Sequence, residues 1–172
     1  AALVDVALRT GLTQAATRAV LEVRASNRAA LALYQRFGFT QVSIRPIEPT
    51  DAPLLQEMIR RSDPKDIRMR FLHAMKELPD KLAARLSQID YAREMAFVAL
   101  SADEGELMGV VRMHADPDYQ RAEYAVLVRS DLKGRGLGRA PLEKLVRYCR
   151  ARRSREPEIG GTTNTRCFRD WC

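Results

Sequence analysis

Several segments of the chain have apolar residues three and four positions apart, the spacing that lines up one face of an α-helix. Gly11 and Gly38 lie at the ends of the first two segments, and glycine commonly ends helices because it adopts left-handed backbone angles without strain. Pro79 is expected to break a later helix. The predicted helices cover residues 1–12, the segment from a cap at Ser26 or Asn27 to Gly38, a segment capped by Thr50, a partly helical stretch at 64–88, and the segment after residue 138.

Other runs, continuous or alternating in hydrophobicity, predict strands. Residues 95–100 are apolar throughout, as in a central strand that is covered on both faces. Turn residues at 103–105 and 116–118 separate this run from the next two, which favours an antiparallel meander. The predicted strands cover residues 19–23, 39–47, 95–100, 106–114 and 121–129, and residues 159–163 allow a further short one.

The composition is typical of one soluble globular domain. The 172 residues, 46% hydrophobic and 30% charged, suffice for one sizeable core and are too few for two ordinary domains. No apolar run is long enough to span a bilayer, and the apolar N-terminus lacks the basic region and cleavage site of a signal peptide. Three cysteines without zinc-site spacing predict a reduced, cytoplasmic protein.

Charge and histidine content narrow the class of ligand. Only His73 and His114 are present, so a multi-histidine metal site is not expected. The net charge of +7 favours an anionic ligand. Much of the excess lies near the end of the last predicted helix, where cations complement the helix dipole, so neither nucleic acid nor a membrane is the expected partner. These residues are Arg147, Arg150, Arg152, Arg153 and Arg155.

A glycine-rich turn at Lys133–Arg139 joins the predicted strand 121–129 to the last helix. The first N–H groups of a helix lack intrahelical partners and lie at its positive end, so a phosphate there receives several hydrogen bonds. Such a turn also resembles a dinucleotide-binding fingerprint, but that site needs a parallel βαβ unit, which a meander does not supply. The glycines are Gly134, Gly136 and Gly138, and the cations are Lys133, Arg135 and Arg139.

The run Lys133–Gly138 resembles the acetyl-CoA signature of the GNAT acetyltransferase superfamily, with lysine in place of the usual first residue. Other segments look like the GNAT module of bacterial protein lysine acetyltransferases, and the resemblance spans residues 44–153. It implies an α/β (α+β) fold, with a mixed, mostly antiparallel sheet flanked by helices, and acetyl-CoA as the acyl donor. The matching segments are Ile44–Ile47, Arg68–Phe71, Ile89–Tyr91, Arg93–Met95 and Arg121–Tyr124.

The resemblance also implies roles for single residues. Glu123 matches the glutamate that takes the proton of the attacking amine in these lysine acetyltransferases. Read from the residues alone, Glu123 also fits a surface carboxylate paired with Arg112 or Arg121. The implied pantetheine-binding residues are Val126, Leu127 and Val128, and the implied pyrophosphate-binding residues are Lys133, Gly134, Arg135, Gly136, Leu137, Gly138 and Arg139.

The segment Leu21–Phe39 resembles the fifth strand and fourth helix of ribosomal-protein alanine acetyltransferases. In that family an asparagine, matched by Asn27, contacts the cofactor arm, and a tyrosine, matched by Tyr34, protonates the departing thiolate. Helix capping by Asn27 and core packing by Tyr34 explain the same residues without a cofactor. Asn164 lies in a segment that resembles the same strand-to-helix junction and is a further candidate contact to the cofactor.

The two halves of a GNAT domain therefore stand in an unusual order. Residues 1–42 resemble a C-terminal half, residues 43–155 the core with the acetyl-CoA motif, and residues 156–172 a truncated tail. Three explanations stay open: a circular permutation in which Ala19–Val23 pairs beside strand 121–129, a remnant of an upstream GNAT domain, or a reading-frame or assembly error.

The sequence thus predicts an N-acetyltransferase that moves an acetyl group from acetyl-CoA to an amine, with a protein lysine as the expected acceptor and no metal. Two alternatives stay open, a catalytically silent acyl-CoA-binding regulatory module and a truncated, non-functional GNAT fragment. Acceptor specificity is expected in the loops between residues 62 and 90, whose sequence does not indicate which acceptor is bound.

Overall fold

The structure is a computed structural model, and it describes residues 2–13, 19–119 and 121–155. Residues Ala1–Gln41 and Val42–Cys172 form two separate compact units. The elements are α1 (Ala2–Thr13), α2 (Arg28–Arg36), β1 (Val42–Pro46), η1 (Pro49–Asp51), α3 (Ala52–Arg60), α4 (Pro64–Phe71), α5 (Asp80–Ser87), β2 (Glu94–Ser101), β3 (Leu107–Ala115), β4 (Ala122–Val128), η2 (Ser130–Leu132) and α6 (Arg139–Arg155).

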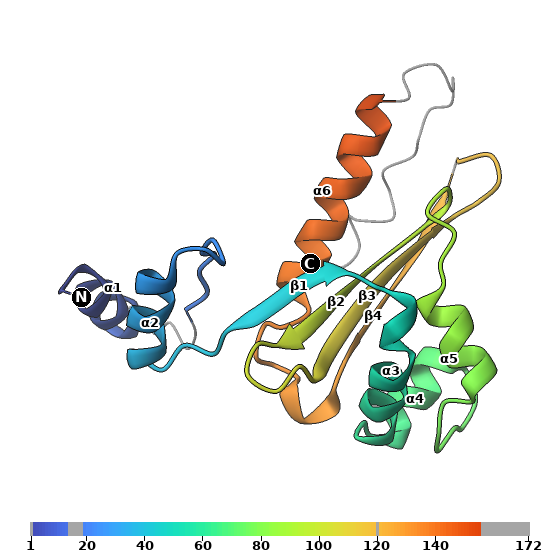
Figure 1. The fold of residues 1–172 in the computed structure, drawn as a ribbon, viewed down its shortest axis with the longest axis horizontal. Helices are drawn as coiled ribbons and strands as arrows, with labels where there is room; N and C mark the ends of the chain where they lie inside the picture. The colour runs from blue at the N-terminus through green and yellow to red at the C-terminus, as the bar shows by residue number, and fades with distance from the viewer. Residues whose placement is uncertain (1, 14–18, 120, 156–172) are drawn as a thin grey trace. The chain divides into compact units, whose positions relative to one another are not determined.

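The second unit is built on a four-stranded antiparallel sheet in the order β1-β2-β3-β4 (Figure 1). The register places Val98 opposite Val110, and Val111 opposite Val126. Every residue of β2 from Glu94 to Ala99 is buried, as the continuous apolar run predicted for a strand covered on both faces. The predicted meander and fold class are confirmed.

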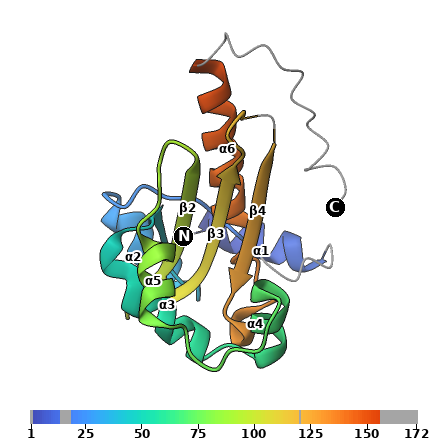
Figure 2. The same cartoon turned by 90° about the vertical axis from the view of Figure 1, so that its right-hand side faces the viewer.

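Helices cover both faces of this sheet, with α6 on one face and α3, α4 and α5 on the other (Figures 1 and 2). On the α6 face, Phe97 and Val111 pack in one cluster with Leu145. On the opposite face, Val98 packs with Met58 of α3. Full burial of side chains of this size stabilises the fold by about 1.5–3 kcal/mol each, so the layers are held mainly by their apolar contacts.

Asp51 organises the connection from β1 to α3. Its buried carboxylate accepts hydrogen bonds from the Arg45 guanidinium at 2.6 and 2.8 Å and from the Glu48 backbone N–H at 2.8 Å. Thr50 lies inside η1, so its predicted role as the helix cap is wrong. The capping prediction failed because the partner that selects Asp51 is on the preceding strand and not in the helix.

Two other predictions need correction. Helix α1 continues through Gly11 to Thr13, so Gly11 does not end it. Residues 19–23 form neither helix nor strand, and Val20 is 73% exposed, because an apolar run this short forms a strand only when it finds a partner. The four strands of the described sheet do not include residues 19–23, and the three explanations for the order of the two halves stay open.

Smaller differences concern where elements end. The strand predicted at 39–47 is shorter, Val42–Pro46, and Pro46 lies at its end as expected. The break in the helical stretch 64–88 begins at Leu72, where φ is 62°, and extends to Pro79. Residues 156–172, which include the possible strand at 159–163, lie outside the described residues. Among the helices that are described, none combines the length and the hydrophobicity needed to cross a bilayer.

Candidate active site

The turn between β4 and α6 exposes backbone N–H groups at the start of a 17-residue helix. Gly134 and Gly136 have φ values of 73° and 78°, a region that other residues adopt only with strain. In the part of the chain that the structure describes, the N–H groups of Leu137 and Gly138 donate no hydrogen bond. Because these N–H groups lie at the positive end of the α6 dipole, the turn can bind a phosphate group.

Gly138 brings this turn into close contact with β4. A Cβ atom at this position would lie 3.3 Å from Val128 Cγ2 and 3.4 Å from Val126 Cγ1. Glycine therefore sets the distance between the strand and the helix start. Val126 is 38% exposed, so the strand beside the turn is open to solvent. The implied pantetheine-binding strand and the implied pyrophosphate-binding turn thus adjoin each other.

Two cations of the turn already form ion pairs with carboxylates. The Lys133 ammonium pairs with the Asp66 carboxylate of α4, and Arg139 Nε lies 2.7 Å from Glu143 Oε1. Asp66 also accepts a 2.6 Å hydrogen bond from Ser130 Oγ, and both interactions, that with Lys133 first, lower the pKa of Asp66. Helix α4 is therefore tied to the turn through charged groups.

Arg129 anchors the end of β4 and was not singled out from the sequence. Its buried guanidinium donates hydrogen bonds to Asp131 at 2.8 and 3.1 Å and to Glu106 at 2.7 Å, and Glu106 also pairs with Arg61, the residue directly after α3. This network joins η2 to the residue before β3 and the residue after α3, just before the glycine turn. The spacing of Arg129 and Asp131 is a local signal, but the bond to Glu106 joins residues 23 positions apart and leaves no pattern in the sequence.

Glu123 lies on β4 and is exposed. Side chains alternate along a strand, so Glu123 faces the same side as Leu127, which packs in the core cluster of α3 and α5. Its partner across the strand pair is His114. The alternative in which Glu123 pairs with Arg112 or Arg121 is not seen, and among the described residues its carboxylate has no hydrogen bond or ion pair. A carboxylate in this setting is available to accept a proton.

Next to this strand pair lies a buried carboxylate that the sequence did not reveal. Glu94 of β2, whose side chain is 3% exposed, receives two hydrogen bonds from Arg85, at 2.5 and 3.1 Å, and contacts His114 Nδ1 at 3.0 Å. The bond from Arg85, more than any other interaction, lowers the pKa of Glu94 to about 2. The ion pair from α5 to β2 therefore orients the histidine that stands opposite Glu123.

The remaining candidate residues lie elsewhere in the chain. Asn27 caps α2 by accepting a 3.1 Å hydrogen bond from the Ala30 N–H. Tyr34 packs edge-on against Phe39, with ring centroids 5.8 Å apart. The capping explanation of Asn27 is thus confirmed. Tyr34 contacts Phe39 but is only partly buried, and α2 has no fully buried residue, so its packing in a core is not confirmed. The predicted cofactor roles of both residues stay predictions. Asn164 lies outside the described residues.

Comparison with known proteins identifies the family. The sequence profile of the Acetyltransferase (GNAT) family matches residues 57–164, a segment that contains β4, the glycine turn and α6 up to its end. The chain belongs to the GNAT family of acetyltransferases. GNAT enzymes use acetyl-CoA as the acyl donor, so the general chemistry of the family is acyl-CoA-dependent acetyl transfer.

Individual relatives agree with this assignment. Acetyltransferase PA5475 of Pseudomonas aeruginosa is 33% identical over 133 residues, which cover 76% of this chain and 72% of that protein. The GNAT domain of S. lividans PAT matches with a TM-score of 0.59 and 26% identity, over 64% of this chain and 66% of that one. A GNAT acetyltransferase from Streptococcus pneumoniae, 20% identical with a TM-score of 0.50 over 64% of this chain and 68% of that one, shares the fold.

Proposed function

We propose that this GNAT domain is an N-acetyltransferase that transfers an acetyl group from acetyl-CoA to an amine, with a protein lysine as the acceptor. The observation that carries the proposal is the geometry at the start of α6. Two backbone N–H groups there donate no hydrogen bond among the described residues, two glycines have positive φ, and Gly138 lies in close contact with β4. An acyl-CoA needs a site of this kind, with N–H groups at a helix start to bind its pyrophosphate and an exposed strand beside them to bind its pantetheine arm.

In this proposal the turn Lys133–Arg139 holds the pyrophosphate and the backbone of Val126–Val128 holds the pantetheine arm. Acetyl-CoA supplies the acetyl group as a thioester. Arg135 is exposed on the turn and adds positive charge next to the N–H groups. Among the described residues no group of three or more His, Cys, Asp and Glu side chains could hold a metal ion, and the proposed reaction needs none.

Glu123 is proposed as the general base. The acceptor arrives as an ammonium ion, whose proton must leave before the nitrogen lone pair can attack the acetyl carbonyl carbon. The Glu123 carboxylate takes that proton, the new C–N bond forms, and the C–S bond breaks so that the sulfur leaves and is protonated. Tyr34 as the proton donor to sulfur, and Asn27 and Asn164 as cofactor contacts, rest on the resemblance alone.

Protein lysine as the acceptor is supported by the sequence motifs shared with bacterial protein lysine acetyltransferases, among them Arg68–Phe71 and Arg121–Tyr124. Similarity to the GNAT domain of S. lividans PAT is consistent with these motifs. A cytoplasmic location remains a prediction from the cysteine content.

A single set of measurements tests the proposal. Acetylation of a lysine peptide is followed by mass spectrometry, and acetyl-CoA binding by calorimetry, for the wild type and Glu123→Gln. Loss of a general base should lower kcat/KM by about 10²–10⁴-fold while the Kd for acetyl-CoA is unchanged. Glu104→Gln, which changes an exposed carboxylate on the β2–β3 turn, is the matched control.

Each other outcome has a defined meaning. Full activity of Glu123→Gln would remove Glu123 from the mechanism. Binding of acetyl-CoA by the wild type without transfer to any amine would favour the acyl-CoA-binding regulatory module. No binding at all would show that the turn at the start of α6 is not an acyl-CoA site.

A further inference from the structure

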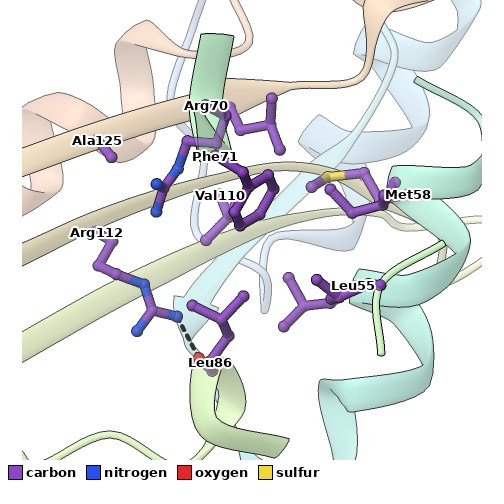
Figure 3. A pocket seen from close by; sticks show the side chains of 11 residues that line it. Leu55, Met58, Arg70, Phe71, Leu86, Val110, Arg112 and Ala125 are labelled. Atoms are coloured by element: carbon purple, nitrogen blue, oxygen red, sulfur yellow. Dashed lines mark hydrogen bonds between the residues drawn. The ribbon is translucent and has the colours of Figure 1, made fainter. Parts of the chain in front are cut away.

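A small cavity of about 20 Å³ lies between the sheet and the helices on the Glu123 face. Its walls are mostly apolar and come from α3, α5, β3 and β4, but two arginines also line it, Arg70 of α4 and Arg112 of β3 (Figure 3). A cavity of this size accommodates roughly one water-sized group. The two guanidinium groups thus border a space that is otherwise hydrophobic.

The charge of Arg112 is balanced within the protein. Its side chain is 13% exposed, it donates a hydrogen bond to the Leu86 carbonyl (Figure 3), and it lies 3.7 Å from the Glu94 carboxylate. Burial lowers the pKa of Arg112 to about 10, with Arg70 and Arg85 acting in the same direction. Glu94 is shared by Arg85 and Arg112, so it offers little further compensation to a third cation.

Arg70 has no such balance. Its half-buried guanidinium stacks over the Phe71 ring, with the Cζ atom 5.1 Å from the ring centroid. Among the residues that the structure describes, Arg70 makes no hydrogen bond and no ion pair. Partial burial of a cation without a partner costs free energy, and burial lowers the pKa of this group. A bound anion would remove that cost.

The position of Arg70 relates it to the proposed base. The cavity reaches β4 at Ala125, which is two residues from Glu123 and on the same face of the strand. Two residues of a strand span roughly 7 Å. An anionic group bound at the Ala125 end of the cavity would therefore lie roughly that far along β4 from Glu123.

We infer that Arg70 binds a carboxylate on the acceptor, so that the preferred acceptor is a lysine with an acidic residue within two positions in sequence. This inference rests on the proposed acetyl transfer to lysine. Arginine suits the role because its planar guanidinium can donate two parallel hydrogen bonds to a carboxylate. The net charge of +7 adds a general attraction for acidic acceptors.

The test uses matched peptides with one lysine and one glutamate at position −2, −1, +1 or +2, and their glutamine counterparts. With the wild type, at least one glutamate peptide should have a KM about tenfold lower than its glutamine counterpart. Arg70→Gln should abolish that difference, raising KM for the glutamate peptide with little change in kcat. Arg68→Gln removes an exposed cation from the same helix and should preserve the difference.

Two further measurements separate this inference from the acetyl-transfer proposal. Calorimetric binding of the peptides to the protein with CoA gives the glutamate–glutamine difference in Kd even if no acetyl group is transferred. If no acetyl group is transferred but the glutamate peptide still binds more tightly than its glutamine counterpart, the acetyl-transfer proposal is wrong and the carboxylate site is supported. Arg70→Glu should reverse the preference, towards peptides with arginine in place of glutamate.

The inference is overturned if the wild type binds each glutamate peptide and its glutamine counterpart equally. It is also overturned if Arg70→Gln and Arg68→Gln change the glutamate preference to the same extent, because the effect would then be one of net charge. Circular dichroism of each variant shows whether it is folded, and Arg70→Lys, which keeps the charge without the planar fork, should retain only part of the preference.

Discussion

The buried carboxylate of Glu94 allows a quantitative test of how the helices on the Glu123 face are held to the sheet. Glutamine at this position has the shape of the protonated acid, so Glu94→Gln removes the charge with little change in volume. Arg85 loses a partner with bonds of 2.5 and 3.1 Å, and Arg112 keeps its buried charge without the carboxylate 3.7 Å away. The free energy of unfolding should therefore decrease.

The size of the effect follows from the pKa of Glu94, which is lowered from 4.5 to about 2 in the folded protein. A shift of this size corresponds to up to about 3 kcal/mol of stabilisation, and the 3% exposure of the side chain leaves little solvent screening. The folded-state pKa lies below the unfolded value, so this stabilisation is complete well above pH 4.5 and is lost as the pH falls towards 2. At pH 3 roughly 1.5 kcal/mol should remain.

Urea denaturation of the wild type, Glu94→Gln and the exposed control Glu104→Gln at pH 7 and pH 3 measures these values. The wild type should exceed Glu94→Gln by up to about 3 kcal/mol at pH 7 and by about half as much at pH 3. Glu104→Gln should match the wild type within about 0.5 kcal/mol. The reasoning would be refuted if Glu94→Gln and Glu104→Gln were equally stable at pH 7, or if the difference between them were as large at pH 3 as at pH 7.

Three further predictions concern the acetyl-CoA turn. Gly138→Val places side-chain atoms against Val126 and Val128, so urea denaturation should show a loss of about 1–3 kcal/mol and calorimetry a weaker affinity for acetyl-CoA. Asp66→Asn removes the partner of the Lys133 ammonium and frees it for phosphate, so the Kd for acetyl-CoA should fall by about two- to fivefold; a rise would show that the ion pair instead shapes the site. In the wild type, acetyl-CoA at a hundred times its Kd should raise the free energy of unfolding by about 2.7 kcal/mol, and no cooperative transition would indicate an unstable fragment.

Much of the fold of the second unit could be predicted because its signals are local. The apolar run at 95–100, the turn residues after it and the alternation in the next two strands specify a meander without knowledge of distant partners. The glycine turn is equally local, since positive φ at Gly134 and Gly136 depends on their lack of a side chain. The prediction of a cap at Ser26 or Asn27 was correct for the same reason, and Asn27 is the residue that caps α2.

Two failed predictions depended on interactions that the pattern of residue types does not show. An apolar run at 19–23 reads as a strand, yet strand formation needs a neighbour to satisfy its backbone. Thr50 has the chemistry of a cap, but it lies inside η1. Asp51, the residue before α3, binds Arg45 and the Glu48 N–H with its carboxylate and not the N–H groups of the helix.

The sequence by itself determined the family, the meander and the position of the glycine turn, because these depend on residue types at short spacing. Only the tertiary structure decided which charges meet: Lys133 with Asp66, Arg129 with Glu106, and Glu94 with Arg85 and His114. Ion pairs of this kind join elements that are far apart in the chain and depend on the distance and burial of their atoms. For the same reason Arg70 emerged only from the structure, since a cation without a partner can be recognised only when its surroundings are known.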